Sequence, residues 1–367
     1  MQQFKFCTSF FHAFSGAGFL PKIRKAILVE LVLLAVVLSL GMREQQAVTV
    51  ESSSTGQDYI KWVDFTVSYE ALCRAYDWDV DTHGTEHEVN WIDLLAYTAA
   101  RTGGEFDKKK AMGILDDTAK QLSDGETTIE KLTGDMKYFT YYKEAYTAAL
   151  GGLVGEYEAE ETDENGNVRY CTRYGLKAYF PLARGFDYSH YDDFGVGRSY
   201  GYKRRHLGHD MMGLVGTPVM AVESGYVEAL GWNQYGGWRI GIRSFDGKRY
   251  YYYAHLRQNY PYAEHLEEGS VVTAGDVIGY MGHTGYSTKE NVNNIEVTHL
   301  HWGLELIFNE AQKECDNEIW IDVYPLTRFL AKHTQAAKKV EGTKEWVRTT
   351  GIKDPEVEKY CEGKEPR

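Results

Sequence analysis

Apolar residues recur every three to four positions from residue 58 to about residue 155, which is the spacing of amphipathic helices. The pattern is clearest in W-I-D-L-L-A-Y-T-A-A and in Y-F-T-Y-Y-K-E-A-Y-T-A-A-L. We therefore predict a small helical bundle and assign it to residues 58–160.

The pattern changes after Asn165-Gly166, a pair that suits a tight turn: glycines become frequent and short β-rich runs replace the helical period. Gly-containing turns between these runs favour a mainly antiparallel sheet over residues 168–335, so the expected fold class is α+β. The charged, weakly periodic residues 336–367 are expected to form a C-terminal surface extension. Strands are expected at residues 217–230, 238–243, 250–256, 277–281 and 299–308.

A long apolar run covers residues 26–40 and follows the basic residues Lys22, Arg24 and Lys25. This arrangement predicts a cytoplasmic N-terminus at residues 1–25, a transmembrane anchor at 26–42 and a polar linker at 43–57. The run is short for a full span and contains Glu30, so a cleaved signal sequence or an ordinary buried helix stays as an alternative. The expected location is extracytoplasmic and anchored to the cell membrane, or secreted if the segment is cleaved.

Charge and cysteine content narrow the function further. The 53 acidic and 40 basic residues give a formal net charge of −13, which repels phosphate backbones and argues against nucleic-acid binding. Lys203-Arg204-Arg205 is a local basic patch beside the first histidine cluster. The five cysteines form no C-x-x-C pair, so we expect buried or free thiols, with a Cys171–Cys315 disulfide as the alternative in an exported chain.

Histidine clusters in the β-rich region carry the candidate chemistry. In R-R-H-L-G-H-D, the even separation of His206 and Asp210 places both side chains on one face of a strand, and His209 then points the other way. In T-H-L-H-W-G-L-E-L-I-F, His299 and His301 share a face by the same alternation. Gly303 and Glu305 are expected on that polar face, and the opposite face is apolar, with Leu300, Trp302, Leu304, Leu306 and Phe308.

A third strand in K-R-Y-Y-Y-Y-A-H-L is expected to place Tyr251, Tyr253 and His255 together and to present the histidine to the same surface. Catalytic zinc takes three protein ligands and keeps a fourth position for water. The four histidines and one aspartate are two more residues than zinc needs, so two of the histidines are free to assist catalysis.

The order H-x-x-x-D, Y-A-H-L, H-L-H resembles the lysostaphin-type, or LytM-type, zinc metalloendopeptidases, a family of bacterial cell-wall hydrolases. The resemblance covers roughly residues 190–310. Thr298 and Trp302 depart from the small or proline residue and the phenylalanine that commonly flank H-L-H in this family. Further matching segments are F-G-V-G-R, G-T-P-V-M-A-V-E-S-G-Y-V and V-T-A-G-D-V-I-G-Y-M-G-H-T-G-Y-S-T.

The resemblance implies that His206, Asp210 and His301 bind one zinc ion per chain and that His255 and His299 are the catalytic pair. It implies hydrolysis of peptidoglycan stem peptides or cross-bridges by a metal-activated water. Because the glutamate of H-E-x-x-H enzymes is missing, the two histidines are expected to orient water, shuttle protons or stabilise the oxyanion. Tyr200 or Tyr202 is a further candidate oxyanion donor. Protein partners stay open.

Two other metal motifs occur in D-W-D-V-D-T-H-G-T-E-H-E. Asp77, Asp79, Asp81 and Glu88 match a calcium loop, but Thr82 replaces its turn glycine, so a solvated loop is favoured. The H-x-x-E-H match from His83 to His87 needs a helix, which Gly84 and Thr85 disfavour.

The rival function is a catalytically latent wall-binding or scaffold protein with the same fold. Such a protein would be expected to lack a ligand or a catalytic histidine, and none is missing here. The complete set favours an active enzyme.

Overall fold

The computed structural model describes residues 59–106, 109–200, 202–313 and 317–363, and the side chains of Tyr200 and Tyr202 are outside this description. The expected anchor at 26–42, the linker at 43–57, Cys7 and Cys315 also lie outside the described residues. Within the described ranges, no helix is both long and apolar enough to cross a membrane. Cys73, Cys171 and Cys361 are free thiols.

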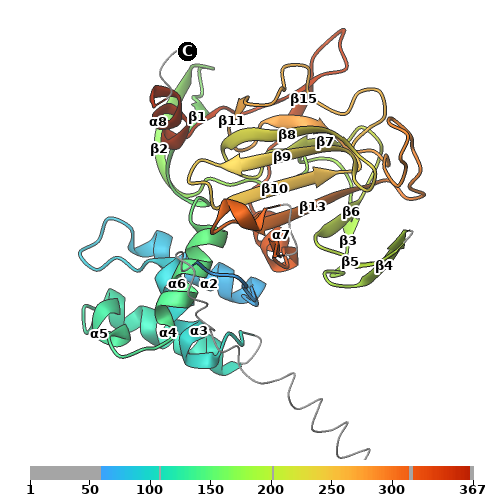
Figure 1. Ribbon diagram of the computed structural model, residues 1–367. Coiled ribbons are helices and arrows are strands. Elements are labelled where there is room, and N and C mark those ends of the chain that lie inside the picture. The colour runs from blue at the N-terminus through green and yellow to red at the C-terminus, as the bar shows by residue number, and fades with distance from the viewer. Residues whose placement is uncertain (1–58, 107–108, 201, 314–316, 364–367) are drawn as a thin grey trace, which may run out of the picture. The chain divides into compact units, whose positions relative to one another are not determined.

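The expected helical region is confirmed up to Leu150 (Figure 1), but the end of the assigned range 58–160 is wrong, because strand β1 (Val154–Thr162) begins there. Ser68 and Asn90 cap the first two helices through their side-chain oxygens, and the second ends at Gly103, whose φ of 71° suits glycine. The helices of this region are α2 (Tyr69–Thr82), α3 (Trp91–Thr102), α4 (Lys109–Ser123), α5 (Ile129–Thr133) and α6 (Phe139–Leu150).

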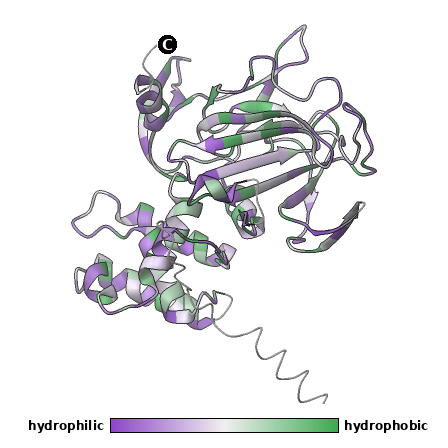
Figure 2. Cartoon of the chain, in the orientation of Figure 1, coloured by the Kyte–Doolittle hydropathy of each residue, from purple (hydrophilic) through white to green (hydrophobic). Residues whose placement is uncertain are grey.

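The helices alternate apolar and hydrophilic residues along their length, as the green and purple bands in Figure 2 show. Their apolar side chains join the same buried cluster as those of the sheet, for example Leu94 and Tyr146 together with Tyr251 and Trp302. Burial of such surface is the main stabilising contribution to the fold. The helical region and the sheet therefore share one hydrophobic core.

The mainly antiparallel sheet is also confirmed. It has eight strands in the order β11-β8-β9-β10-β13-β6-β3, with β14 paired to β13, and every pairing is antiparallel. The strands are β3 (Ser189–His190), β6 (His209–Met212), β8 (Gly225–Asn233), β9 (Gly237–Ser244), β10 (Arg249–Ala254), β11 (Val271–Val272), β13 (His299–Leu306) and β14 (Ile319–Trp320).

Smaller elements flank this sheet. The strand expected at 217–230 is two strands, because β7 (Pro218–Met220) pairs with β12 (Val277–Tyr280) and the chain then enters the large sheet as β8. The remaining elements are β1 (Val154–Thr162), β2 (Val168–Leu176), β4 (Gly197–Tyr200), β5 (Tyr202–Arg205), η1 (Glu310–Gln312), α7 (Tyr324–Leu330), β15 (Ala337–Lys339), β16 (Trp346–Arg348), β17 (Ile352–Lys353) and α8 (Pro355–Glu362).

Strand pairing and ion pairs attach the C-terminal segment to the rest of the fold. Strand β17 pairs with β1, and Lys177 Nζ lies 2.8 Å from Asp354 Oδ1 in a buried ion pair. The charged composition of this segment therefore includes structural contacts as well as solvated side chains.

The alternation expected for β13 is confirmed: Leu300, Trp302, Leu304 and Leu306 are fully buried. On the other face, Glu305 is 2% exposed and its Oε1 has no hydrogen-bond partner among the described residues. Burial raises the pKa of Glu305 from its ordinary value of 4.5 to about 8.

Glu305→Gln should make the free energy of unfolding less dependent on pH. The raised pKa means that the fold favours the protonated acid, so this stability is present below pH 4.5 and is lost as the pH rises towards 8. The free energy of unfolding of the variant, measured relative to the parent, should be roughly 3–4 kcal/mol higher at pH 8 than at pH 4.5. Urea unfolding at both pH values measures the difference, with the exposed Glu126→Gln as control. An equal effect at both pH values would contradict the prediction.

Candidate active site

Three side chains from separate segments converge on one point. His206 Nε2 lies 3.0 Å from Asp210 Oδ1 and 2.9 Å from His301 Nδ1. His301 Nδ1 is 2.9 Å from the same Asp210 oxygen. Two imidazole nitrogens and a carboxylate are the donors that catalytic zinc prefers, so the set fits the expected ion. Among the described residues, this group is the one whose ligand atoms are gathered closely enough to hold a metal.

Strand pairing and a glycine produce this convergence. Asp210 on β6 and His301 on β13 are direct partners across the antiparallel ladder. The spacing predicted that His206 lies on the same strand as Asp210. In the structure it lies between strands, because β5 ends at Arg205 and β6 begins at His209. The turn between them brings Gly208 so close to His301 that an added Cβ would lie 2.5 Å from the ring. The prediction of a common strand was therefore wrong, although the two side chains do meet.

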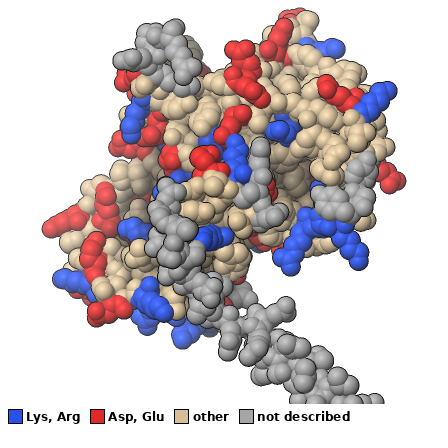
Figure 3. Space-filling model, viewed as in Figure 1, with Lys and Arg blue, Asp and Glu red and all other residues tan. Residues whose placement is uncertain are grey.

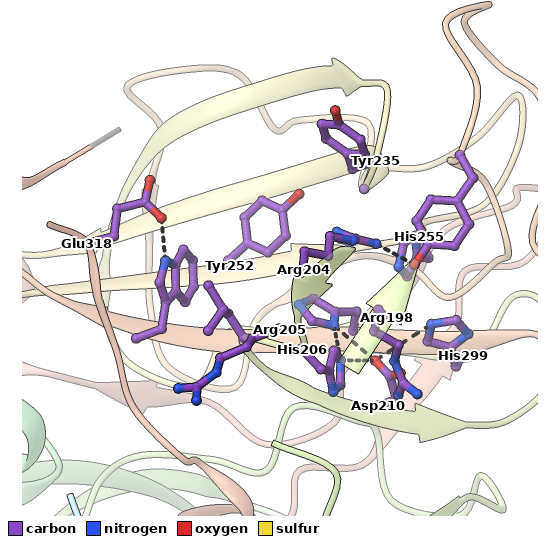
Figure 4. A pocket seen from close by; sticks show the side chains of 16 residues that line it. Arg198, Arg204, Arg205, His206, Asp210, Tyr235, Tyr252, His255, His299 and Glu318 are labelled. Atoms are coloured by element: carbon purple, nitrogen blue, oxygen red, sulfur yellow. Dashed lines mark hydrogen bonds and ion pairs between the residues drawn. The ribbon is translucent and has the colours of Figure 1, made fainter. Parts of the chain in front are cut away.

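His255 and His299 lie beside this group. Their ring centroids are 4.7 Å apart, and the His255 centroid is 5.8 Å from that of His301. His299 Nε2 is 3.7 Å from Asp210 Oδ1. All five histidine and aspartate side chains expected at the site are therefore neighbours, and Figure 4 shows four of them with labels.

The expectation that Tyr251, Tyr253 and His255 share a face is wrong. Both tyrosines are fully buried in the core, where Tyr253 Oη accepts from the Val222 amide. His255 follows the end of β10 and has a φ of 61°, a left-handed conformation that interrupts the strand alternation and turns its ring towards the site. Tyr252, from the opposite face, lines the cleft instead.

Backbone carbonyls orient both of these histidines. His255 Nδ1 lies 2.9 Å from the Thr284 carbonyl, and His299 Nδ1 lies 2.8 Å from the Val297 carbonyl. Because a carbonyl only accepts hydrogen bonds, Nδ1 carries the proton in each ring. Nε2 is then the nitrogen that can accept a proton. Burial lowers the pKa of His255 well below its ordinary value, which favours the neutral ring.

Hydrogen bonds and burial also set the charge of the group. Burial raises the pKa of Asp210, but hydrogen bonds from His206 and His301 outweigh this effect and hold it below its ordinary value. Burial lowers the pKa of His301 below 6.5. An ionised aspartate and a neutral imidazole are the forms that bind a metal ion.

Asp193 and Arg198 support the group from outside, and sequence reasoning missed both. His206 Nδ1 is 3.1 Å from the Asp193 carbonyl and 3.1 Å from its Oδ2. Arg198 Nη2 contacts the Asp193 carboxylate and lies 3.3 Å from Asp210 Oδ2. Asp193 lies in a loop 13 positions before His206, where no periodic pattern indicates it.

Asp193→Asn should weaken zinc binding about 10- to 100-fold, because outer carboxylates orient histidine ligands and raise their basicity. Competition with a chromophoric chelator measures the affinity, and circular dichroism of the zinc-free protein shows whether the fold is kept. The adjacent Asp192 is exposed, so Asp192→Asn is a matched control that should bind zinc like the parent. Equal affinities for the two variants would exclude this role.

The site opens into a cleft of about 260 Å³. It is lined by the β5 residues Arg204 and Arg205 and, beyond Tyr252, by Trp320 and Glu318 (Figure 4). Trp320 Nε1 donates to Glu318 Oε2 at 2.7 Å. The lining residues run from Arg198 to Trp320, and no described residue of α2 to α6 is among them.

The two other metal motifs do not form sites. Asp77, Asp79 and Asp81 lie on α2, where positions two apart point in different directions. Asp79 is buried and accepts from Tyr174 Oη at 2.7 Å and from the Trp91 amide at 2.8 Å. Helix α2 ends at Thr82, before the H-x-x-E-H segment begins at His83. The structure gives these residues a structural explanation.

The antiparallel sheet gathers two histidines and an aspartate, the donor types of a catalytic zinc site, with two more histidines beside them. Residues 204–314 match the model of Peptidase family M23. These residues are therefore similar to the lysostaphin and LytM type of that family, as expected from the sequence.

Curated relatives agree with this assignment. The chain is 35% identical over 161 residues to the L-Ala--D-Glu endopeptidase of Bacillus subtilis, covering 44% of this chain and 46% of that protein. It is 38% identical over 89 residues to lysostaphin of Staphylococcus simulans, covering 24% and 17%. The glycyl-glycine endopeptidase ALE-1 of Staphylococcus capitis is 38% identical over 89 residues, covering 24% and 23%. The chain thus spans less than half the length of these relatives.

Among solved structures, a LytM protein of Ruminococcus gnavus is similar at 25% identity with a TM-score of 0.49. The match covers 75% of this chain and 91% of that one.

Proposed function

We propose that this protein is an extracytoplasmic zinc-dependent endopeptidase that hydrolyses peptide bonds of bacterial peptidoglycan. The observation that carries the proposal is the convergence of His206, Asp210 and His301 beside His255 and His299. The match of residues 204–314 to Peptidase family M23 supports the reaction class, and the names of the relatives support a cell-wall peptide as substrate. Membrane attachment through residues 26–42 belongs to the same proposal.

His206, Asp210 and His301 would hold one zinc ion per chain. When bound, zinc supplies a Lewis acid for the scissile carbonyl and lowers the pKa of a coordinated water. Asp193 fixes the ring of His206 by accepting a hydrogen bond from its Nδ1. The His206 Nε2 then faces the ligand atoms of Asp210 and His301.

His255 and His299 would act on protons. Each offers an Nε2 without a proton, and both rings adjoin the ligand group. One such nitrogen can accept the proton of the attacking water, and the resulting imidazolium can donate to the leaving amine. The protonated ring also stabilises negative charge on the carbonyl oxygen.

The alternative is a latent wall-binding protein in which the helical region covers the cleft. The described helices contribute no residue to the cleft lining, so the described structure gives this alternative no support. The complete set of histidines favours the enzyme.

Digestion of purified peptidoglycans with the full-length, zinc-loaded protein tests the proposal. We expect new free amines, identified by mass spectrometry of the released muropeptides, that are absent with His301→Ala. The exposed His265→Ala is the matched control and should retain activity. If no wall type releases amines although one zinc is bound per chain, the latent binding function would replace the enzyme.

A further inference from the structure

A basic hairpin borders the cleft. Strands β4 and β5 contain Arg198, Lys203, Arg204 and Arg205 and no acidic residue, although the whole chain has 53 acidic and 40 basic residues. Figure 3 shows the blue side chains gathered at the lower right of the view, over these strands. A local positive charge on an acidic protein points to an anionic ligand.

The Arg204 guanidinium is held in place on the cleft wall by two tyrosines. Its carbon lies 5.4 Å from the ring centroid of Tyr235 and 5.1 Å from that of Tyr286. Its Nη2 donates to Tyr286 Oη. These contacts orient the planar fork before a ligand arrives, so less entropy is lost on binding.

No acidic side chain of the described residues is paired with Arg204. Its Nε is buried and has no hydrogen-bond partner among the described residues, whereas Arg198 is neutralised by Asp193 and Asp210. Glu318, the other acid of the cleft lining besides Asp210, is bonded to Trp320. A half-buried guanidinium without a counter-ion is costly, and a carboxylate from the ligand would compensate it.

Arg204 is also close to the proposed chemistry. The ring of Tyr286, which contacts the guanidinium, has its centroid 5.9 Å from that of His255. Figure 4 shows the Arg204 guanidinium directed towards His255, whereas that of Arg205 extends to the other side of His206. A carboxylate bound to Arg204 would therefore belong to a residue adjacent to the scissile bond.

We propose that Arg204 binds a free carboxylate of the substrate residue next to the scissile bond, and so selects acidic stem peptides over uncharged bridges. The proposal rests on the proposed function of the same site. The two activities named for the relatives differ in this feature, because an L-Ala–D-Glu bond has a carboxylate beside it and a glycyl-glycine bond has none. The chain is thereby assigned to the first kind of substrate.

Cleavage of three peptides tests the proposal with the full-length, zinc-loaded protein. They are a stem peptide with an L-Ala–D-Glu bond, the same peptide with that glutamate carboxylate amidated, and pentaglycine. We expect the carboxylate peptide to be cut best. Arg204→Gln should lower kcat/KM for the carboxylate peptide about 10- to 100-fold, which is the usual contribution of hydrogen bonds to a charged group. For the amidated peptide, kcat/KM should change less than threefold. Arg204→Lys, which keeps the charge without the fork, should be intermediate.

Lys203, also on β5, is exposed and does not line the cleft. Lys203→Gln removes the same charge and is therefore the matched control, expected to behave like the parent. Equal losses on the carboxylate and amidated peptides in Arg204→Gln, or a parent that prefers pentaglycine, would overturn the proposal.

Binding of the first two peptides to the full-length His299→Ala variant separates this proposal from the proposed function. One outcome is that the parent cuts none of the peptides, yet the carboxylate peptide binds more tightly than the amidated one and this difference depends on Arg204. The enzyme is then rejected and the carboxylate site stands. If binding is also indifferent to the carboxylate, both are rejected.

Discussion

His299→Ala should retain one zinc ion per chain and lower kcat about 10²- to 10⁴-fold, the usual contribution of a positioned acid or base. His255→Ala should behave in the same way. The reason is geometric: the three proposed ligand atoms belong to His206, Asp210 and His301, and the other two histidines lie beside them. Metal analysis of the purified variants and release of free amines from peptidoglycan measure the two quantities.

His301→Ala is the necessary comparison, because removal of a proposed ligand should cause loss of zinc and activity together. The two kinds of variant are therefore distinguished by metal content rather than by activity. Loss of the ion from His299→Ala would make His299 a ligand and would require a different division of roles.

The second large effect concerns stability. Arg249→Met should lower the free energy of unfolding by about 3–5 kcal/mol, because it leaves a buried carboxylate without its partner. Arg249 is 1% exposed, and its Nε and Nη2 donate to the two oxygens of Glu223 at 2.8 and 3.1 Å. Its Nη1 donates to the Ala148 carbonyl at 2.8 Å at the end of α6, so the side chain ties the helical region to β10. Urea unfolding measures the loss.

The double variant Arg249→Met, Glu223→Gln should recover part of this loss, because a neutral amide removes the buried charge. The amide oxygen can still accept the hydrogen bond that Tyr251 Oη donates to Glu223 at 2.6 Å in the parent. Arg169→Met, at an exposed arginine paired with Glu161, should change stability by less than about 0.5 kcal/mol. If the buried and exposed substitutions have similar effects, Arg249 does not link the two regions.

The candidate metal ligands could be predicted from the sequence because two of them lie on strands, where alternation is a local property of the backbone. His301 and its apolar neighbours Leu300 and Trp302 follow that alternation in the structure. His255 does not, because its positive φ depends on the turn that follows β10. A pattern of residue types contains no signal for such a backbone conformation at a non-glycine residue.

The sequence by itself determined the periodic parts of this protein: a helical region, a mainly antiparallel sheet and the identities of five polar residues at one site. Tertiary structure decided what depends on contacts between distant segments. Asp193 contacts His206 from a loop, Arg249 contacts the end of α6, and Arg204 contacts Tyr235 and Tyr286. Helical and strand periods are set by local backbone geometry, whereas these pairings arise only when the shared hydrophobic core brings the segments together.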